Sequence, residues 1–183
     1  MLVGICADVP QSGKTSAAKT FIQAGWQHLS FGEPVKLTLA CFLQAIGAKG
    51  QIADYLWGAK KGSIIPEIGI TGGALMSSFA TDYVRDMVNP DTWLGAMKKQ
   101  IDGLPASVNV VIDDLRFVNE ADWIKANGGY IIHIYRPDAP KHNRSIKSEG
   151  LLWDYPHDFR VINDGSLVDL DIKIGQILSR LHS

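Results

Sequence analysis

The chain has 183 residues, 46% of them hydrophobic, and a formal net charge of −1 at pH 7. This length allows one well-buried core but not a second full domain, so we expect a single domain over residues 1–183. The near-zero charge argues against a nucleic-acid binder or a membrane-surface protein and favours small-molecule partners. No apolar run approaches the roughly 20 residues that cross a bilayer, and no charged leader is seen, so we expect a cytoplasmic protein.

The first part of the chain alternates between strand and helix patterns. An apolar run over residues 2–7 predicts a strand, and a helical pattern follows over about 14–24. A weaker strand is expected at 26–31. A second helix is predicted between Pro34 and Gly47 from apolar side chains at helical spacing, which are Val35, Leu39, Phe42 and Ile46.

Four glycines and a proline predict a loop over residues 60–73. Two helices are expected after it. The first carries Leu75, Phe79, Tyr83 and Met87, and the second begins at Asn89-Pro90-Asp91 and carries Trp93, Leu94 and Met97. We expect these two helices to form one wall of a cleft.

Three more strands are predicted in the second half. Apolar runs at 108–112 and 131–135 are typical of buried parallel strands, and a crossover helix at 119–126 separates them. A long polar segment over 138–158 precedes a last strand at 159–162 and an amphipathic helix. This alternation predicts a three-layer α/β fold with a parallel sheet of about five strands and helices on both faces.

The two cysteines lie in different patterns, Cys6 in the first strand and Cys41 in the second helix. Both are expected to be small core residues, neither a disulfide pair nor a metal site, as in a reducing cytosol. No histidine stands in a cluster with metal-ligand spacing, so a zinc site is not expected.

The loop after the first strand carries the clearest chemical signal. The string S-G-K-T over Ser12–Thr15 supplies backbone N–H groups, a helix N-terminus, a lysine and a metal-facing hydroxyl, as a phosphate site requires. The pattern G-x-x-x-x-G-K-[ST] has glycine where this chain has Asp8, and we expect that carboxylate to weaken triphosphate binding. An ordinary strand-to-helix turn with a solvent lysine is the alternative.

Further segments follow in a consistent order: F-G-E-P-V-K at 31–36, T-D-Y-V-R-D at 81–86, N-P-D-T-W at 89–93, D-L-R-F-V-N-E at 114–120, R-P at 136–137, S-E at 148–149 and N-D-G at 163–165. Together with the loop they resemble the deoxynucleoside monophosphate kinases of bacteriophages, P-loop relatives of the adenylate and guanylate kinases. The resemblance covers most of the chain. It implies an enzyme that moves the γ-phosphoryl of ATP to a (deoxy)nucleoside monophosphate, with an acceptor-side helical region at about 33–102 and a lid at about 137–158.

The chain departs from the family pattern in two further places. The family's acidic residue after the loop lysine is Thr15 here, followed by Ser16. In the segment that resembles G-R-x-L-L-Q-x-L-G, Gly73 and Ser77 replace the arginine and glutamine. With Asp8, these changes leave open a nucleotide-binding relative with weakened turnover, and the preferred base cannot be inferred.

Phosphoryl transfer needs cations, a magnesium anchor and backbone donors. Lys14 is expected to reach the donor phosphates, with N–H groups of Ser12 and Gly13, while Thr15 or Ser16 holds Mg²⁺. Asp114, at the carboxyl end of a strand, can orient the metal's waters or contact the acceptor. Asp113 is its rival, and a helix N-cap is the alternative role. On the donor side, the resemblance and the lid add Arg136, Arg144 and Asn163.

On the acceptor side, Arg85 and Arg116 can each present a planar fork to a phosphate, although either can also form a surface ion pair. Trp93 can stack on the acceptor base or fill the core beneath it. Glu120 can orient Arg116 or bind the sugar, and the resemblance adds Lys36 to this side.

Two alternatives to this function remain at the level of the sequence. One is another small P-loop kinase, such as one acting on dephospho-coenzyme A, and the other is a nucleotide-binding relative without turnover. The expected partners are small-molecule nucleotides, with no nucleic acid and no membrane, and a homodimer is left open.

Overall fold

A computed structural model describes residues 1–139 and 150–181. The chain forms two compact units. The sheet unit comprises Met1–Ser30 and Met97–Ser183, and the helical unit comprises Phe31–Ala96. The expected single domain, with a lid at 137–158, stays a prediction.

The sheet unit is built on five strands, which are β1 (Leu2–Cys6), β2 (Gln27–Leu29), β5 (Val110–Ile112), β6 (Tyr130–Tyr135) and β7 (Phe159–Ile162). Their order is β2-β5-β1-β6-β7, and every neighbouring pair is parallel. The predicted α/β fold with a five-stranded parallel sheet is therefore confirmed. All five carboxyl ends lie along one edge of the sheet, where open α/β sheets bind ligands.

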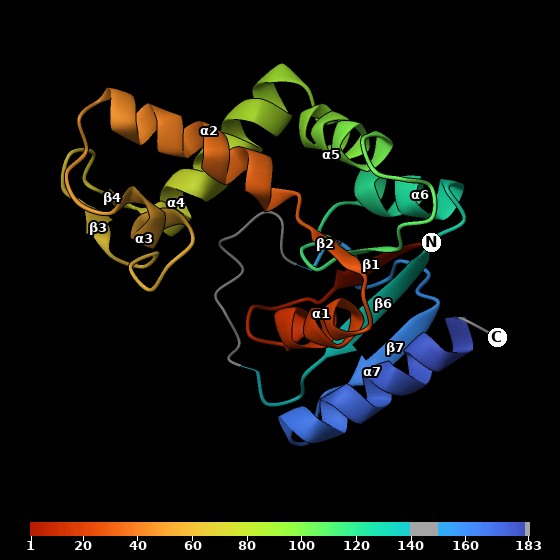
Figure 1. Ribbon diagram of the computed structural model, residues 1–183. Helices are drawn as coiled ribbons and strands as arrows, with labels where there is room; N and C mark the ends of the chain where they lie inside the picture. Colours follow the sequence, from red (N-terminus) through yellow and green to blue (C-terminus); the bar gives the residue numbers. More distant parts are fainter. Residues whose placement is uncertain (140–149, 182–183) are drawn as a thin grey trace. The chain divides into compact units, whose positions relative to one another are not determined.

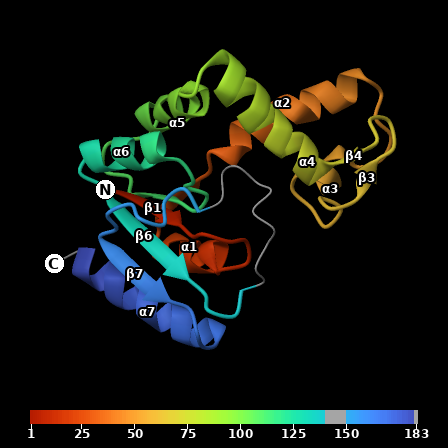
Figure 2. The same ribbon diagram turned by 180° about the vertical axis from the view of Figure 1, so that it is seen from behind.

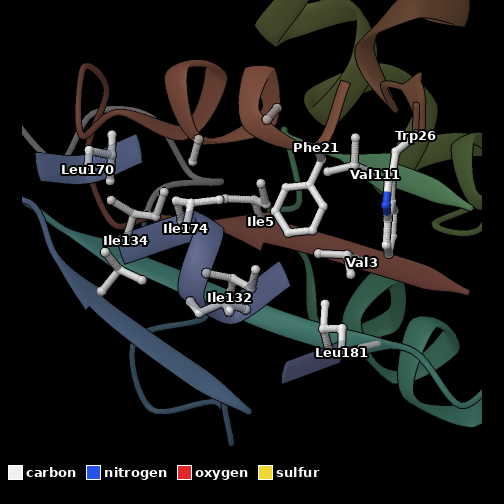
Figure 3. Packing of buried hydrophobic residues seen from close by; sticks show 14 residues of the cluster. Val3, Ile5, Phe21, Trp26, Val111, Ile132, Ile134, Leu170, Ile174 and Leu181 are labelled. Atoms are coloured by element: carbon white, nitrogen blue, oxygen red, sulfur yellow. The ribbon is translucent and has the colours of Figure 1, made fainter. Parts of the chain in front are cut away.

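Helices cover both faces of this sheet, as Figures 1 and 2 show. Helices α1 (Lys14–Gln23) and α7 (Leu167–Leu181) pack on one face, where Val3 and Ile5 of β1 meet Phe21 and Ile174 of the helices (Figure 3). Phe21 is fully buried, and burying a side chain of this size stabilises the fold by roughly 1.5–3 kcal/mol.

Helix α6 (Val118–Ala126) covers the opposite face. Its Ile124 approaches β1 so closely that a Cβ at Gly4 would lie 2.6 Å from the Ile124 Cδ1 atom. A larger residue at position 4 would therefore force the Ile124 side chain to move. The three predicted layers are thus α1 with α7, the sheet, and α6.

The helical unit contains α2 (Gly32–Ala45), α3 (Ile52–Leu56), the hairpin β3 (Ile64–Ile65) and β4 (Ile70–Thr71), α4 (Gly72–Ser77), the π-helix η1 (Ser78–Val88) and the start of α5 (Thr92–Asp102). A second core of Val35, Leu39, Leu43, Leu56, Ile65, Val84 and Trp93 holds it together. The loop predicted at 60–73 also contains the strands β3 and β4 and the start of α4, because strands of two residues leave no periodic pattern in the sequence.

Some apolar side chains that stand at helical spacing in the sequence are exposed in the helical unit. Phe42 is 44% exposed, because the buried face of α2 repeats every four residues at Val35, Leu39 and Leu43. Met87 is 75% exposed, because η1 winds as a π-helix, whose turn is longer than the α-helical turn assumed in the prediction. Long π-helices are rare and have no sequence signature.

The cysteine prediction is half right. Cys6 is buried and Cys41 is exposed, and both are free. Burial raises the pKa of the Cys6 thiol to about 12, and the nearby Asp8 carboxylate adds to this shift. Cys6 is thus a protonated, unreactive core residue. No helix of the described chain is long and apolar enough to cross a membrane.

Candidate active site

The loop between β1 and α1, residues 7–13, is held by a hydrogen bond within the loop and by another from a residue that follows β7. We call it the phosphate loop. The buried Ser12 donates from its Oγ to the Val9 carbonyl at 2.7 Å. Asn163, directly after β7, donates from Nδ2 to the Ser12 carbonyl at 3.0 Å in a buried hydrogen bond. These bonds hold the loop in one conformation, as a preformed anion site requires.

Gly13 is required by its conformation and by its surroundings. Its φ of 104° is in the left-handed region, and a Cβ would lie 2.7 Å from the Asn163 Nδ2 atom. Gly13 occupies the N-cap position of α1, and it has no side chain that could accept a hydrogen bond from the first N–H groups of the helix. The first N–H groups of α1 are therefore the ones that an anion would satisfy.

Arg136 also reaches this loop. Its Nη1 donates to the carbonyl of Gln11 at 3.3 Å. Gln11 has a φ of 61°, which is uncommon for a residue other than glycine. Arg136 therefore contacts the phosphate loop, and its role in binding a triphosphate stays a prediction. Arg144 lies outside the described residues.

Lys14 is in a crowded electrostatic environment. Burial lowers the pKa of its amine from the usual 10.5, and the positive charge of Arg116 lowers it further. The carboxylates of Asp113 and Asp114 act in the opposite direction. Arg116, Asp113 and Asp114 thus all act on the charge of Lys14, and an anionic ligand would offset the repulsion between the two cations.

The two carboxylates that follow β5 are each held by a residue of the β2 strand end. Asp113 is buried, with Oδ1 2.8 Å from Nε2 of His28. Asp114 accepts a hydrogen bond from the Oγ of Ser30 at 2.7 Å through Oδ2. His28 and Ser30 were missed in the sequence analysis, and their place at the end of a predicted strand was the available signal.

Glu120 fixes the backbone of Arg116 and Phe117 before the start of α6. The Glu120 side chain is nearly completely buried, and its Oε2 accepts the backbone N–H groups of Arg116 at 3.0 Å and Phe117 at 3.1 Å. These are the contacts of a residue that caps the start of α6. Arg116 itself is exposed. A role for Glu120 in binding the sugar stays a prediction.

Asp8 does not stand unpaired in the phosphate loop. Its Oδ2 lies 2.9 Å from Nε2 of His133 on β6. Gln11 is the only described residue other than glycine with a positive φ, so Asp8 is not strained where the common pattern has glycine. The expectation of a carboxylate directed at the phosphates did not foresee this partner, and its effect on triphosphate binding stays a prediction.

The acceptor-side residues Lys36, Arg85 and Trp93 belong to the helical unit. Arg85 is buried on η1. The indole of Trp93 is buried and donates from Nε1 to the Ala80 carbonyl at 3.0 Å, which is the core position weighed as the alternative to base stacking. Lys36 lies 3.5 Å from the Glu33 Oε2 atom. Their roles in binding the acceptor stay predictions.

By its strand order and by the loop that leaves β1, the chain has the P-loop fold of small kinases. Two solved structures share this fold at 13% identity and a TM-score of 0.54. One is a dephospho-CoA kinase from Campylobacter jejuni, with 98% of this chain and 96% of the other covered. The second is a protein from Thermus thermophilus, with 99% and 97% covered.

The chain belongs to the deoxynucleotide monophosphate kinase family. The family model described as deoxynucleotide monophosphate kinase matches residues 70–174. A protein of Acanthamoeba polyphaga mimivirus named "Putative deoxynucleotide monophosphate kinase" is 33% identical over 161 residues, which cover 75% of this chain and 79% of the relative. The family resemblance seen in the sequence is confirmed.

Proposed function

We propose that this kinase moves the γ-phosphoryl group of ATP to a deoxynucleoside monophosphate. An oxygen of the acceptor phosphate would attack the γ-phosphorus, the bond to the β-phosphate would break, and ADP would leave with the bridging oxygen. The observation that carries the proposal is the partly desolvated Lys14 at the start of α1, close to Arg116 and to two carboxylates. This is the charge arrangement that phosphoryl transfer requires.

The donor side fits a triphosphate in three respects. Gly13 leaves the N-terminal amides of α1 uncapped, Lys14 supplies a positive charge beside them, and Arg136 reaches the loop from the end of β6. Asn163 acts through its bond to Ser12, by keeping the loop in shape. ATP is thus the proposed donor, and Arg144 remains a proposed lid cation.

Magnesium is proposed to bind through the hydroxyl of Thr15 or Ser16, with Asp114 orienting its waters. When bound, the ion would neutralise the charge that develops on the transferred group. Ser30 fixes one Asp114 oxygen by its hydrogen bond. The residues present therefore fit a hard, oxygen-binding cation.

On the acceptor side, Arg116 is proposed to bind the acceptor phosphate with its planar guanidinium, since the Glu120 cap fixes the backbone from which it extends. Arg85, Lys36 and Trp93, which belong to the helical unit, are also proposed to bind the acceptor. A cytoplasmic location and a set of partners limited to small nucleotides are part of the same proposal.

A coupled assay of ADP release tests the proposal, with ATP, Mg²⁺ and each common ribo- and deoxynucleoside monophosphate in turn. Turnover with at least one deoxynucleotide, and none in Lys14→Ala, is expected. Dephospho-coenzyme A is tested as a further acceptor, and turnover with it alone would favour the alternative kinase class. ATP binding without turnover on any acceptor would identify a relative that has lost activity, as Asp8, Gly73 and Ser77 suggest.

A further inference from the structure

A buried histidine lies directly behind the phosphate loop. His133 is 1% exposed in the middle of β6, and its Nε2 is 2.9 Å from the Asp8 Oδ2 atom. The side chain of Asp8 is 18% exposed, so this is a mostly buried contact. Asp8 stands at the loop position where the common pattern has glycine. The pair therefore joins β6 to the phosphate loop.

The protonation of His133 follows from its other ring nitrogen. Nδ1 is buried and has no hydrogen-bond partner among the described residues. A hydrogen on Nδ1 would be an unsatisfied buried donor, so the hydrogen belongs on Nε2, which donates it to the Asp8 carboxylate. His133 thus acts as a neutral donor to a charged acceptor, which is among the stronger kinds of hydrogen bond.

The charged and titratable neighbours of His133 come from each element around it. Cys6 on β1 and Arg160 on β7 are its register partners, and the ring of His157 is stacked on it with centroids 4.5 Å apart. Burial lowers the pKa of His157, which favours a neutral ring there too.

Aromatic contacts fix the orientation of the His133 ring. Trp153 packs edge-on against it at 5.9 Å, and the guanidinium of Arg160 lies 5.0 Å from the Trp153 ring centroid. Tyr155 anchors the same segment by donating to the Asp122 Oδ1 atom of α6 at 2.9 Å. A ring enclosed in this way offers Asp8 one fixed donor.

We propose that His133 is a positioning residue that holds the Asp8 carboxylate against β6 and so keeps its charge away from the bound triphosphate. The inference rests on the proposed function, because it assumes that the loop binds ATP. Without the His133 donor, the Asp8 carboxylate would be released within the loop, and its charge would repel the phosphates. The histidine would thus compensate for an acidic residue at a position that usually has none.

A double-mutant cycle measured by calorimetric ATP titration at fixed Mg²⁺ tests this proposal. His133→Leu, which removes the donor, is expected to weaken ATP binding by about tenfold, equivalent to about 1.4 kcal/mol. Asp8→Asn alone is expected to change the affinity by less than about threefold. The double variant is expected to return to within about threefold of the wild type, since the released charge is gone.

A structural role alone would leave the double variant as weak as His133→Leu, and that result would overturn the proposal. Unchanged affinity in His133→Leu would do the same. Should His133→Leu fail to fold, His133→Gln and His133→Asn decide, because Gln places an amide donor near the Nε2 position and Asn does not. Gln is expected to bind ATP like the wild type and Asn more weakly, and equal affinities would overturn the proposal.

The same titrations separate this inference from the proposed function. A wild-type protein that binds no ATP would overturn both. A wild-type protein that binds and turns over ATP, with variants that do not differ from it, would overturn only the role of His133. The KM for the acceptor monophosphate is expected to stay unchanged in every folded variant.

Discussion

The sheet unit and the helical unit differ in how regular they are. In the sheet unit, the phosphate loop, Asp113 and Asp114 follow directly on parallel strands, and Asn163 follows β7. In the helical unit, Arg85 lies on a π-helix and Trp93 lies in the first turn of α5. Regular strands place the proposed donor-side groups, whereas an irregular helical backbone carries most of the proposed acceptor-side groups.

This difference is consistent with the two tasks of a nucleotide kinase. Every such enzyme that uses ATP must bind the same triphosphate, so one arrangement at the sheet edge suffices. The acceptor varies, and recognition of a particular base is a matter of local shape. We therefore expect substitutions at the sheet edge to abolish transfer, and substitutions in the helical unit to affect acceptor binding and stability.

The largest effect is expected from Lys14→Ala. Loss of the main charge on the transferred phosphoryl group should lower kcat by about 10³-fold or more. Lys19→Ala, on the exposed side of the same helix, is the matched control and should stay within about twofold. Initial rates of ADP release measure both. Near-normal turnover in Lys14→Ala would remove the phosphate-loop interpretation.

The next effect is expected from Arg116→Lys, which keeps the charge and loses the planar fork. A misplaced acceptor phosphate should cost about 10²-fold in kcat/KM. Lys98→Arg, at an exposed position of α5, exchanges the same pair of residue types and should have little effect. Steady-state kinetics with the preferred monophosphate compare the two. Similar losses in both variants would argue against a contact between Arg116 and the acceptor.

The same contrast explains what could be predicted from the sequence. Apolar runs revealed β1, β5 and β6 because buried parallel strands need continuous apolar side chains. The S-G-K-T string and the acid after β5 were found because they follow those strands. His28 and His133 were not, because their partners Asp113 and Asp8 are 85 and 125 residues away along the chain. No local pattern reports a contact over such separations.

Less of the helical unit could be predicted from the sequence. The π-helical winding of η1 determines which side chains are buried, so Tyr83 and Met87 are exposed although they stand at α-helical spacing in the sequence. The hairpin of β3 and β4 is held by two residues from each strand. Tertiary packing determines these features, and local propensity is too weak to reveal them.

Within the helical unit, a smaller effect is expected from Gly72→Ala. A Cβ at Gly72 would lie 1.9 Å from the Tyr55 carbonyl oxygen, so α3 or α4 must move. We expect a loss of about 1–3 kcal/mol in the free energy of unfolding. Gly73→Ala is the matched control, because a Cβ there meets nothing closer than 3.6 Å. Urea unfolding compares the two variants, and equal stabilities would contradict the close contact between α4 and α3.

The smallest effect is expected from pH, and it returns to the sheet unit. Burial and Arg116 lower the pKa of Lys14 in the folded protein below its usual 10.5. Between the lowered and the usual pKa, the unfolded chain binds more protons than the folded one. The stability of the ligand-free protein should therefore rise with pH across this window, by an amount that Lys14→Arg removes.

ATP binding should change in the opposite direction across the same window. The triphosphate favours the protonated amine, so its affinity should fall as the pH rises through the lowered pKa of Lys14, by at most about tenfold per pH unit. Lys14→Arg keeps its charge throughout and should show a flatter profile. Calorimetric titration from pH 7 to about 10 measures both proteins. Parallel profiles would mean that Lys14 does not contact the phosphates, because a group that binds the anion must lose affinity when it loses its proton.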